Sequence, residues 1–317
     1  MTTARALPLI VPPVAPKLIA TDLDGTLLRS DGTLSDRTRT ALAAAERAGI
    51  RVVLVTGRPP RRVPDLLATI GPHYVIAANG AAVHAPDGTL AHMSPIRPLA
   101  ATRLITRMRR AIPGVTFAVE YDKNFGHESA YPTWSFGEET AEPVGTAGEL
   151  LTRIPGRPVL KILAHHPTLP LDDFYQQARQ SAGSSAETTH STGLSLVEFS
   201  APRVTKATTL LAWSRRLGVG SHEIAAFGDM PNDLPMLTAV GHSYAMANAH
   251  PDVLEAARHH APANDEDGVA QVLERFVDTL VQRPSRHIPM WTVWDGSADP
   301  ADPADAADPA DAADPLG

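Results

Sequence analysis

Residues Lys17–Thr26 read KLIATDLDGT, an apolar run followed by two aspartates, a glycine and a threonine. The run Lys17–Thr21 has the length and apolar character of a buried parallel strand. Asp22 and Asp24 follow at its carboxyl end, which is the edge where open α/β sheets bind ligands. Because Asp22 and Asp24 are two residues apart, an extended backbone points both side chains to the same side. Close carboxylates repel unless a cation neutralises them, and oxygen ligands suit Mg²⁺. A solvated turn at the end of a strand is the alternative interpretation.

Outward from this stretch, strand patterns alternate with helix patterns. We expect strands at 50–56, 74–78, 223–227 and 243–246. We expect helices at 35–48, 60–70, 205–217, 234–240, 252–257 and 268–281, the first of them capped by Ser35 and closed by Gly49. This alternation predicts an α/β fold with a doubly wound parallel sheet.

In the middle of the chain the order of strand and helix patterns is different, and it predicts a second, α+β domain. Its expected elements are a hairpin (81–84 and 89–93), helices at 99–111 and 171–181, and strands at 115–121 and 159–165, with 195–200 leading out. The loose stretch 122–148 matches no pattern. We therefore expect a core made of 17–80 and 196–285, interrupted by an inserted domain at 81–195.

The two ends of the chain and its composition restrict the function further. Residues 1–16 are broken by prolines and predict a flexible extension; 295–317 is an Ala/Asp/Pro repeat, expected to be disordered. Without the seven aspartates of that tail, the 28 acidic residues left equal the 28 basic ones, which disfavours a nucleic-acid partner. No run is apolar enough for a membrane helix, and with no cysteine we expect a cytoplasmic protein.

A second strand-end motif, Thr56-Gly57-Arg58, follows the run at 50–56. The Thr56 hydroxyl and the amides of the turn can bind phosphate oxygens, and Arg58 adds a forked donor. Alone the signal is weak, because Thr-Gly often simply ends a strand. Lys206 stands just inside the start of a helix, where a cation is poorly placed, so a bound anion would explain it. Lys161, on an expected strand of the insert, is expected to be structural.

The third motif, Gly228-Asp229-Met230-Pro231-Asn232-Asp233, follows the run at 223–227. Asp229 can complete a metal site with Asp22 and Asp24. Asn232 offers a neutral oxygen or an amide, and Asp233 can bind a metal-held water or orient Lys206. A turn with a helix cap is the alternative for this hexapeptide.

Together these motifs resemble the haloacid dehalogenase-like (HAD) hydrolase superfamily, in its Cof-type, sugar-phosphatase-like branch. Three further stretches also resemble that branch: ANGA at 78–81, which contains Asn79, AMANA at 245–249 and NDEDGVA at 264–270. The resemblance implies a Rossmann-like core with an inserted cap. Arg203 and Ala207 depart from it, because small glycines often flank the family's lysine.

The resemblance also implies a chemistry, hydrolysis of a small phosphate ester with Mg²⁺ through an aspartyl-phosphate. Asp22 would be the nucleophile, Asp24 the general acid and base, and Lys206 a ligand of the phosphate oxygens. The metal would be held by Asp22, Asp24 (through its carbonyl), Asp229 and Asp233. The expected phosphate-binding residues are Thr26, Thr56, Gly57, Arg58, Asn79 and Asn232.

Two other functions stay open at this point. A phosphomutase of the same superfamily would use the same aspartates to pass the phosphoryl group to a second hydroxyl. A binding module with a retired active site would hold a phosphorylated ligand without turnover. Sugar phosphates, pyridoxal phosphate and flavin mononucleotide are all compatible substrates, and the oligomeric state is open.

Overall fold

The computed structural model describes the chain except residues 1–10, 13, 133–143, 154–156, 191–194 and 283–317. The expected tail at 295–317 and most of the expected N-terminal extension lie outside the described residues. Among the described helices, none has the length and apolar character needed to cross a membrane.

In the described part of the chain, the larger of two sheets has eight strands in the order β13-β12-β11-β1-β2-β3-β4-β5. Their bounds are β1 Leu18–Thr21, β2 Arg51–Val55, β3 Tyr74–Ala77, β4 Ala82–His84, β5 Leu90–Met93, β11 Ile224–Gly228, β12 His242–Met246 and β13 His259–Ala261. From β13 to β3 every pairing is parallel, and β1 lies between β11 and β2. The predicted doubly wound parallel sheet is thereby confirmed.

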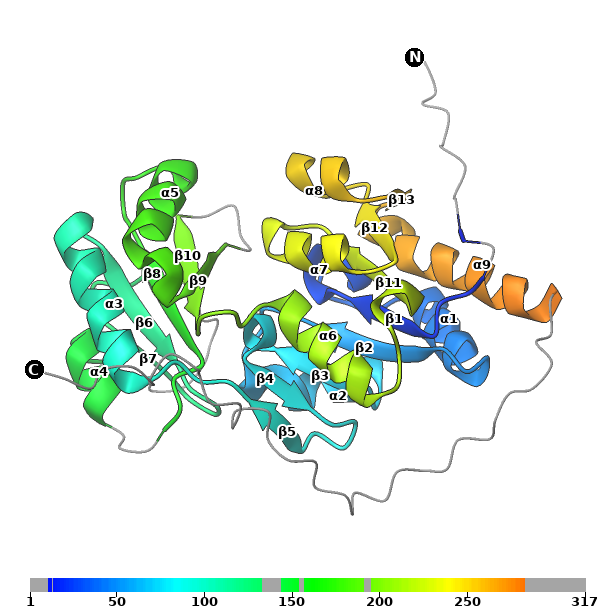
Figure 1. Ribbon diagram of the computed structural model, residues 1–317, viewed down its shortest axis with the longest axis horizontal. Coiled ribbons are helices and arrows are strands. Elements are labelled where there is room, and N and C mark those ends of the chain that lie inside the picture. Colours follow the sequence, from blue (N-terminus) through cyan, green and yellow to red (C-terminus); the bar gives the residue numbers. More distant parts are fainter. Residues whose placement is uncertain (1–10, 13, 133–143, 154–156, 191–194, 283–317) are drawn as a thin grey trace, which may run out of the picture. The chain divides into compact units, whose positions relative to one another are not determined.

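Helices cover both faces of this sheet (Figure 1). Their bounds are α1 Asp36–Arg47, α2 Val63–Ile70, α6 Lys206–Arg216, α7 Leu234–Ala239, α8 Pro251–Ala256 and α9 Gly268–Gln282. Residues of α1, α2 and α9 pack with Ile19 of β1 in one buried cluster, and residues of α6, α7 and α8 pack with Leu18 and Ala20 in another. The side chains of β1 alternate between the two clusters, as the pleat of a strand requires. Ser35 caps α1 as expected, because its side chain accepts a hydrogen bond from the Thr38 amide.

Among the residues that the structure describes, the second sheet has five strands in the order β7-β6-β8-β10-β9, all antiparallel. Its strands are β6 Thr116–Glu120, β7 Phe125–His127, β8 Lys161–His165, β9 Glu187–Thr189 and β10 Leu196–Ser200; its helices are α3 Pro98–Ala111, α4 Ala147–Arg153 and α5 Leu171–Ala182. Leu104 and Met108 of α3 and Phe174 of α5 pack with Phe117 and Ile162 in the core of this domain.

Sheet membership differs from the expected boundaries at two places. The hairpin β4–β5 pairs with β3 in the larger sheet, whereas β10 pairs with β8 and β9 in the smaller one. The chain reverses in the tight turn Ala78–Gly80, all three residues of which have positive φ, so β4 returns antiparallel beside β3. The insert thus begins after β5 and, counted by sheets, ends with β10.

Candidate active site

The sequence motifs converge because the strands that carry them are neighbours. Asp22 follows β1, Thr56 follows β2, Asn79 follows β3 and Asp229 follows β11, all at the carboxyl ends of adjoining strands. The amide of Asp22 donates to the Phe227 carbonyl at 3.0 Å, which extends the β1–β11 pairing up to the motifs. Two segments about 200 residues apart are thereby brought side by side.

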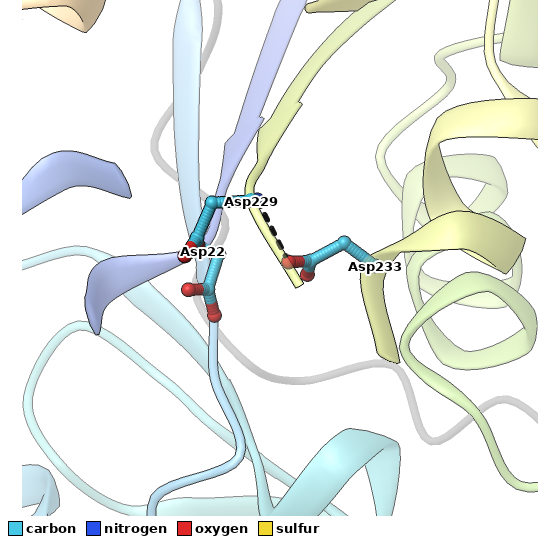
Figure 2. A group of neighbouring side chains, drawn as sticks. All are labelled: Asp22, Asp229 and Asp233. Atoms are coloured by element: carbon cyan, nitrogen blue, oxygen red, sulfur yellow. Dashed lines mark hydrogen bonds between the residues drawn. The ribbon is translucent and has the colours of Figure 1, made fainter. Parts of the chain in front are cut away.

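Asp22, Asp229 and Asp233 form a buried cluster of carboxylates (Figure 2). Each offers one oxygen, and these oxygens all lie within 4.8 Å of one another. Asp233 is held in place by the loop itself, since its Oδ2 accepts from the amides of Asp229 and Met230, each at 3.1 Å. A set of oxygen ligands at this spacing is what Mg²⁺ binds.

Lys206, the first residue of α6, is buried against two members of this cluster. Its Nζ donates to Asp22 Oδ1 at 2.6 Å and to Asp233 Oδ1 at 2.7 Å. Burial alone would lower the pKa of Lys206, but the two carboxylates outweigh it and raise the pKa, so the lysine is charged. These contacts account for a cation at a helix start, the mismatch visible in the sequence.

One lysine does not neutralise three buried carboxylates. Burial raises the pKa of Asp22 well above its ordinary value, even though Lys206 opposes the shift. Burial, followed by repulsion from Asp233, raises the pKa of Asp229 to about 7. The residues present therefore fit a divalent cation in both respects, because they supply oxygen ligands and an unbalanced negative charge.

Gly25 and Thr26 set the position of Asp229. The Thr26 hydroxyl donates to Asp229 Oδ1 at 2.7 Å, so this side chain contacts the carboxylate cluster. Its expected role in phosphate binding stays a prediction. Gly25 has φ +76°, and a Cβ there would lie 2.3 Å from Asp229 Oδ2. Asn248, from the stretch AMANA, donates to the Gly25 carbonyl at 2.8 Å, a role that the sequence did not reveal.

Asp24 lies apart from the carboxylate cluster. Its side chain is 58% exposed and pairs with Arg58, whose Nε donates to Asp24 Oδ2 at 2.8 Å. The Arg58 amide in turn donates to the Thr56 hydroxyl at 3.0 Å. The DxD and TGR motifs are thus joined by a salt bridge, which spacing along the sequence could not predict.

A cavity of about 280 Å³ opens over these residues, between the two sheets. Asp22, Asp24, Arg58 and Asn232 line it from the larger sheet's side. The second domain adds the opposite wall, most of which the sequence reasoning missed: Glu120, Tyr131, Lys161, Leu163, Leu196 and Glu198. Two of these residues stood out in the sequence. Lys161 was expected to be structural, and Tyr131 was expected either to line the inner surface of the insert or to anchor a loop.

Fold and site together define a class of enzyme, and comparison with known proteins agrees. A family profile described as haloacid dehalogenase-like hydrolase matches residues 19–273. The chain therefore belongs to the haloacid dehalogenase-like hydrolases, and the resemblance seen in the motifs is confirmed.

Curated relatives make the class more specific. The chain is 30% identical over 291 residues to phosphatase YwpJ of Bacillus subtilis, covering 82% of this chain and 100% of the relative. It is 29% identical over 253 residues to an HMP-PP phosphatase of Cronobacter sakazakii, covering 77% and 88%. The protein is an enzyme, a hydrolase of the phosphatase type.

Solved structures show the same fold. SMU.1108c of Streptococcus mutans superposes with a TM-score of 0.74 at 23% identity, covering 83% of this chain and 100% of that one. The phosphatase BT1666 of Bacteroides thetaiotaomicron superposes with a TM-score of 0.71 at 25% identity, covering 84% and 98%.

Proposed function

We propose that the protein is a Mg²⁺-dependent phosphomonoester hydrolase that acts on a small phosphorylated metabolite through an aspartyl-phosphate on Asp22. One observation carries the proposal. The Asp22 carboxylate lines the cavity and lies 2.6 Å from a buried lysine, within a cluster of carboxylates that can hold a divalent ion. Relatives named as phosphatases of HMP-PP and of 5-amino-6-(5-phospho-D-ribitylamino)uracil support the substrate class.

In the first step, an oxygen of Asp22 attacks phosphorus and the ester oxygen leaves. Lys206 binds Asp22 Oδ1, which leaves Oδ2 as the attacking atom and orients it. A bound Mg²⁺, held by Asp22, Asp229 and Asp233, would neutralise charge on the phosphate and on the carboxylate that attacks it.

Asp24 is assigned the proton transfers. It donates a proton to the leaving alcohol and, in the second step, accepts one from the water that attacks the phosphoryl group on Asp22. Arg58 holds the Asp24 carboxylate at the cavity wall as an ion pair, the form that accepts a proton from water. To act as the acid in the first step, Asp24 would have to leave Arg58 and take up a proton from solvent. The Thr56–Arg58 turn and the Asn232 side-chain amide would provide donors for the phosphate oxygens. Asn79, also expected to bind phosphate, instead donates its backbone N–H to the Thr56 carbonyl and its Nδ2 to Glu198.

The test is release of inorganic phosphate from p-nitrophenyl phosphate, with Mg²⁺ and with no bisphosphate primer. We expect activity in the wild type, none after EDTA treatment and none in Asp22→Asn, while Asp31→Asn, an exposed turn carboxylate, keeps full activity. Phosphate release that depends on a bisphosphate primer would instead establish the phosphomutase. Binding of phosphate esters without any turnover would establish the retired binding module.

A further inference from the structure

Two charged side chains of the second sheet reach the site from the other side of the cavity. Lys161 of β8 and Glu198 of β10 are 3% and 5% exposed. Lys161 Nζ donates to Glu198 Oε1 at 2.9 Å and to the Gly57 carbonyl at 2.9 Å. Burial would lower the pKa of Lys161, but Glu120 and Glu198 together raise it, so the lysine is charged. A buried ion pair therefore connects the second domain to the TGR turn.

The Glu198 carboxylate also determines how two amides of the larger domain are oriented. Because a carboxylate only accepts hydrogen bonds, Asn79 must turn its Nδ2 toward Glu198. The distance from Asn79 Nδ2 to Glu198 Oε2 is 2.5 Å. Asn79 Oδ1 then faces the other way and accepts from Asn232 Nδ2 at 3.2 Å. The orientation of Asn232, in the loop that supplies Asp229 and Asp233, is thus fixed from the second domain.

The loops that receive these contacts need external support. Ala78 and Asn79 have φ of +50° and +56°, left-handed conformations that residues other than glycine rarely adopt. Gly57, whose carbonyl accepts from Lys161, precedes Arg58, and Arg58 holds Asp24. Lys161 therefore acts on the turn that places Asp24. Glu198 acts, through Asn79, on the loop that carries two of the clustered carboxylates.

We propose that Lys161 and Glu198 are positioning residues for catalysis, which order the two loops around Asp22 when the second domain lies over the larger sheet. The inference rests on the proposed phosphatase function and adds a role that it does not contain. Stability alone is a poor explanation for this pair, because well-packed apolar residues often replace a buried ion pair without loss of stability. Apolar residues cannot orient the Asn79 amide or bind the Gly57 carbonyl.

The experiment separates positioning from stability by removing one or both charges. Lys161→Met leaves Glu198 unpaired in the interior, so it should lower the melting temperature most. Lys161→Met combined with Glu198→Leu removes both charges and should recover most of that loss. For p-nitrophenyl phosphate, we expect kcat of the double variant to stay at least about tenfold below the wild type, with KM within about threefold. The reason is that Lys161 and Glu198 position the loops of Asp24 and of the clustered carboxylates, which act in the transition state.

Several outcomes would overturn the inference. One is a kcat that recovers together with the melting temperature; another is a higher KM at unchanged kcat, the result expected if the pair only keeps the cavity closed. Should the double variant fail to fold, Glu198→Gln gives the second test. Glu198→Gln keeps the shape but no longer forces the Asn79 orientation, so kcat should fall about tenfold. The melting temperature should fall as well, because the buried Lys161 then keeps Glu120, at 4.0 Å, in place of the closer Glu198. A kcat within about threefold would reject the role.

Arg109→Met is the matched control. Arg109 pairs with Glu128 in the same domain, and neither residue lines the cavity, so kcat should not change. A wild-type protein that releases no phosphate would overturn the proposed function and this inference with it. An active wild type whose Lys161 and Glu198 variants match it overturns only the inference.

Discussion

Arg58 holds the carboxylate of Asp24 through two hydrogen bonds, from Nε to Oδ2 at 2.8 Å and from Nη2 to Oδ1 at 2.5 Å. The two acids of the DxD motif thereby have separate environments. Asp22 is buried beside Lys206, whereas Asp24 is largely exposed and faces an arginine at the cavity wall. Two neighbouring carboxyl groups with different partners are suited to different roles, one as nucleophile and one in proton transfer.

Asp24→Asn should lower kcat by roughly 10²–10⁴ without unfolding the protein, since loss of a general acid and base costs about that much. The side chain is 58% exposed and forms its salt bridge with Arg58, so the fold depends little on its charge. Steady-state phosphate release measures the loss of kcat, and a thermal melt checks that the variant stays folded. An effect below about threefold would remove Asp24 from the mechanism.

Gly25→Ala should lower the apparent affinity for Mg²⁺, because the new methyl group would lie 2.3 Å from Asp229 Oδ2 and displace it. Gly32→Ala is the matched control: its φ is +80°, close to the +76° of Gly25, but a Cβ there meets nothing within 4 Å. Both variants carry similar backbone strain, of order 1 kcal/mol. Titration of activity with Mg²⁺ should therefore separate them, and identical titration curves would contradict the assigned position of Asp229.

Lys206→Met should abolish activity and destabilise the protein by about 3–5 kcal/mol, because it leaves Asp22 and Asp233 buried without their counterion. Lys17→Met is the comparison, since Lys17 is 63% exposed and its pair with Glu223 should contribute at most about 1 kcal/mol. Urea unfolding of both variants measures the difference. Equal stabilities would mean that the contacts of Lys206 contribute no more than those of a surface lysine.

Mg²⁺ should raise the melting temperature of the wild type, because it binds the folded carboxylate cluster; a concentration of 100 Kd adds about 2.7 kcal/mol. Without metal at pH 8, Asp229→Asn should be more stable than the wild type. Burial raises the pKa of Asp229 to about 7, so at pH 8 the folded wild type carries a buried negative charge that the asparagine lacks. The same variant should lose the response to Mg²⁺. A full response in Asp229→Asn would place the ion elsewhere.

The sequence predicted those parts of the site that depend on one strand end at a time. An apolar strand followed at once by Asp22, Thr56 or Asp229 predicts a side chain at the carboxyl edge, and the parallel order of the strands gathers these ends. The odd position of Lys206 at a helix start was likewise a usable signal, because its explanation required an anion nearby.

What the sequence did not predict depends on contacts across domains or between loops. Nothing local links Lys161 to the Gly57 carbonyl, 104 residues away, or Glu198 to Asn79, 119 residues away. Strands as short as Phe125–His127 and Glu187–Thr189 show too little alternation to be recognised. The assignment of the hairpin β4–β5 to the larger sheet depended on the left-handed turn Ala78–Gly80. Asn79-Gly80 signals a turn in the sequence, but a turn signal does not say with which sheet the next strand pairs.

The central claim is that Asp22 becomes phosphorylated, and chemical trapping tests it most directly. Asp24→Asn should slow hydrolysis of the intermediate, so this variant is mixed with Mg²⁺ and a phosphate ester and quenched with borohydride, which reduces an acyl phosphate to an alcohol. Peptide mass spectrometry should then find homoserine at position 22 and unmodified aspartate at 229 and 233. Steady phosphate release with an intact aspartate at position 22 in every quenched sample would contradict the account.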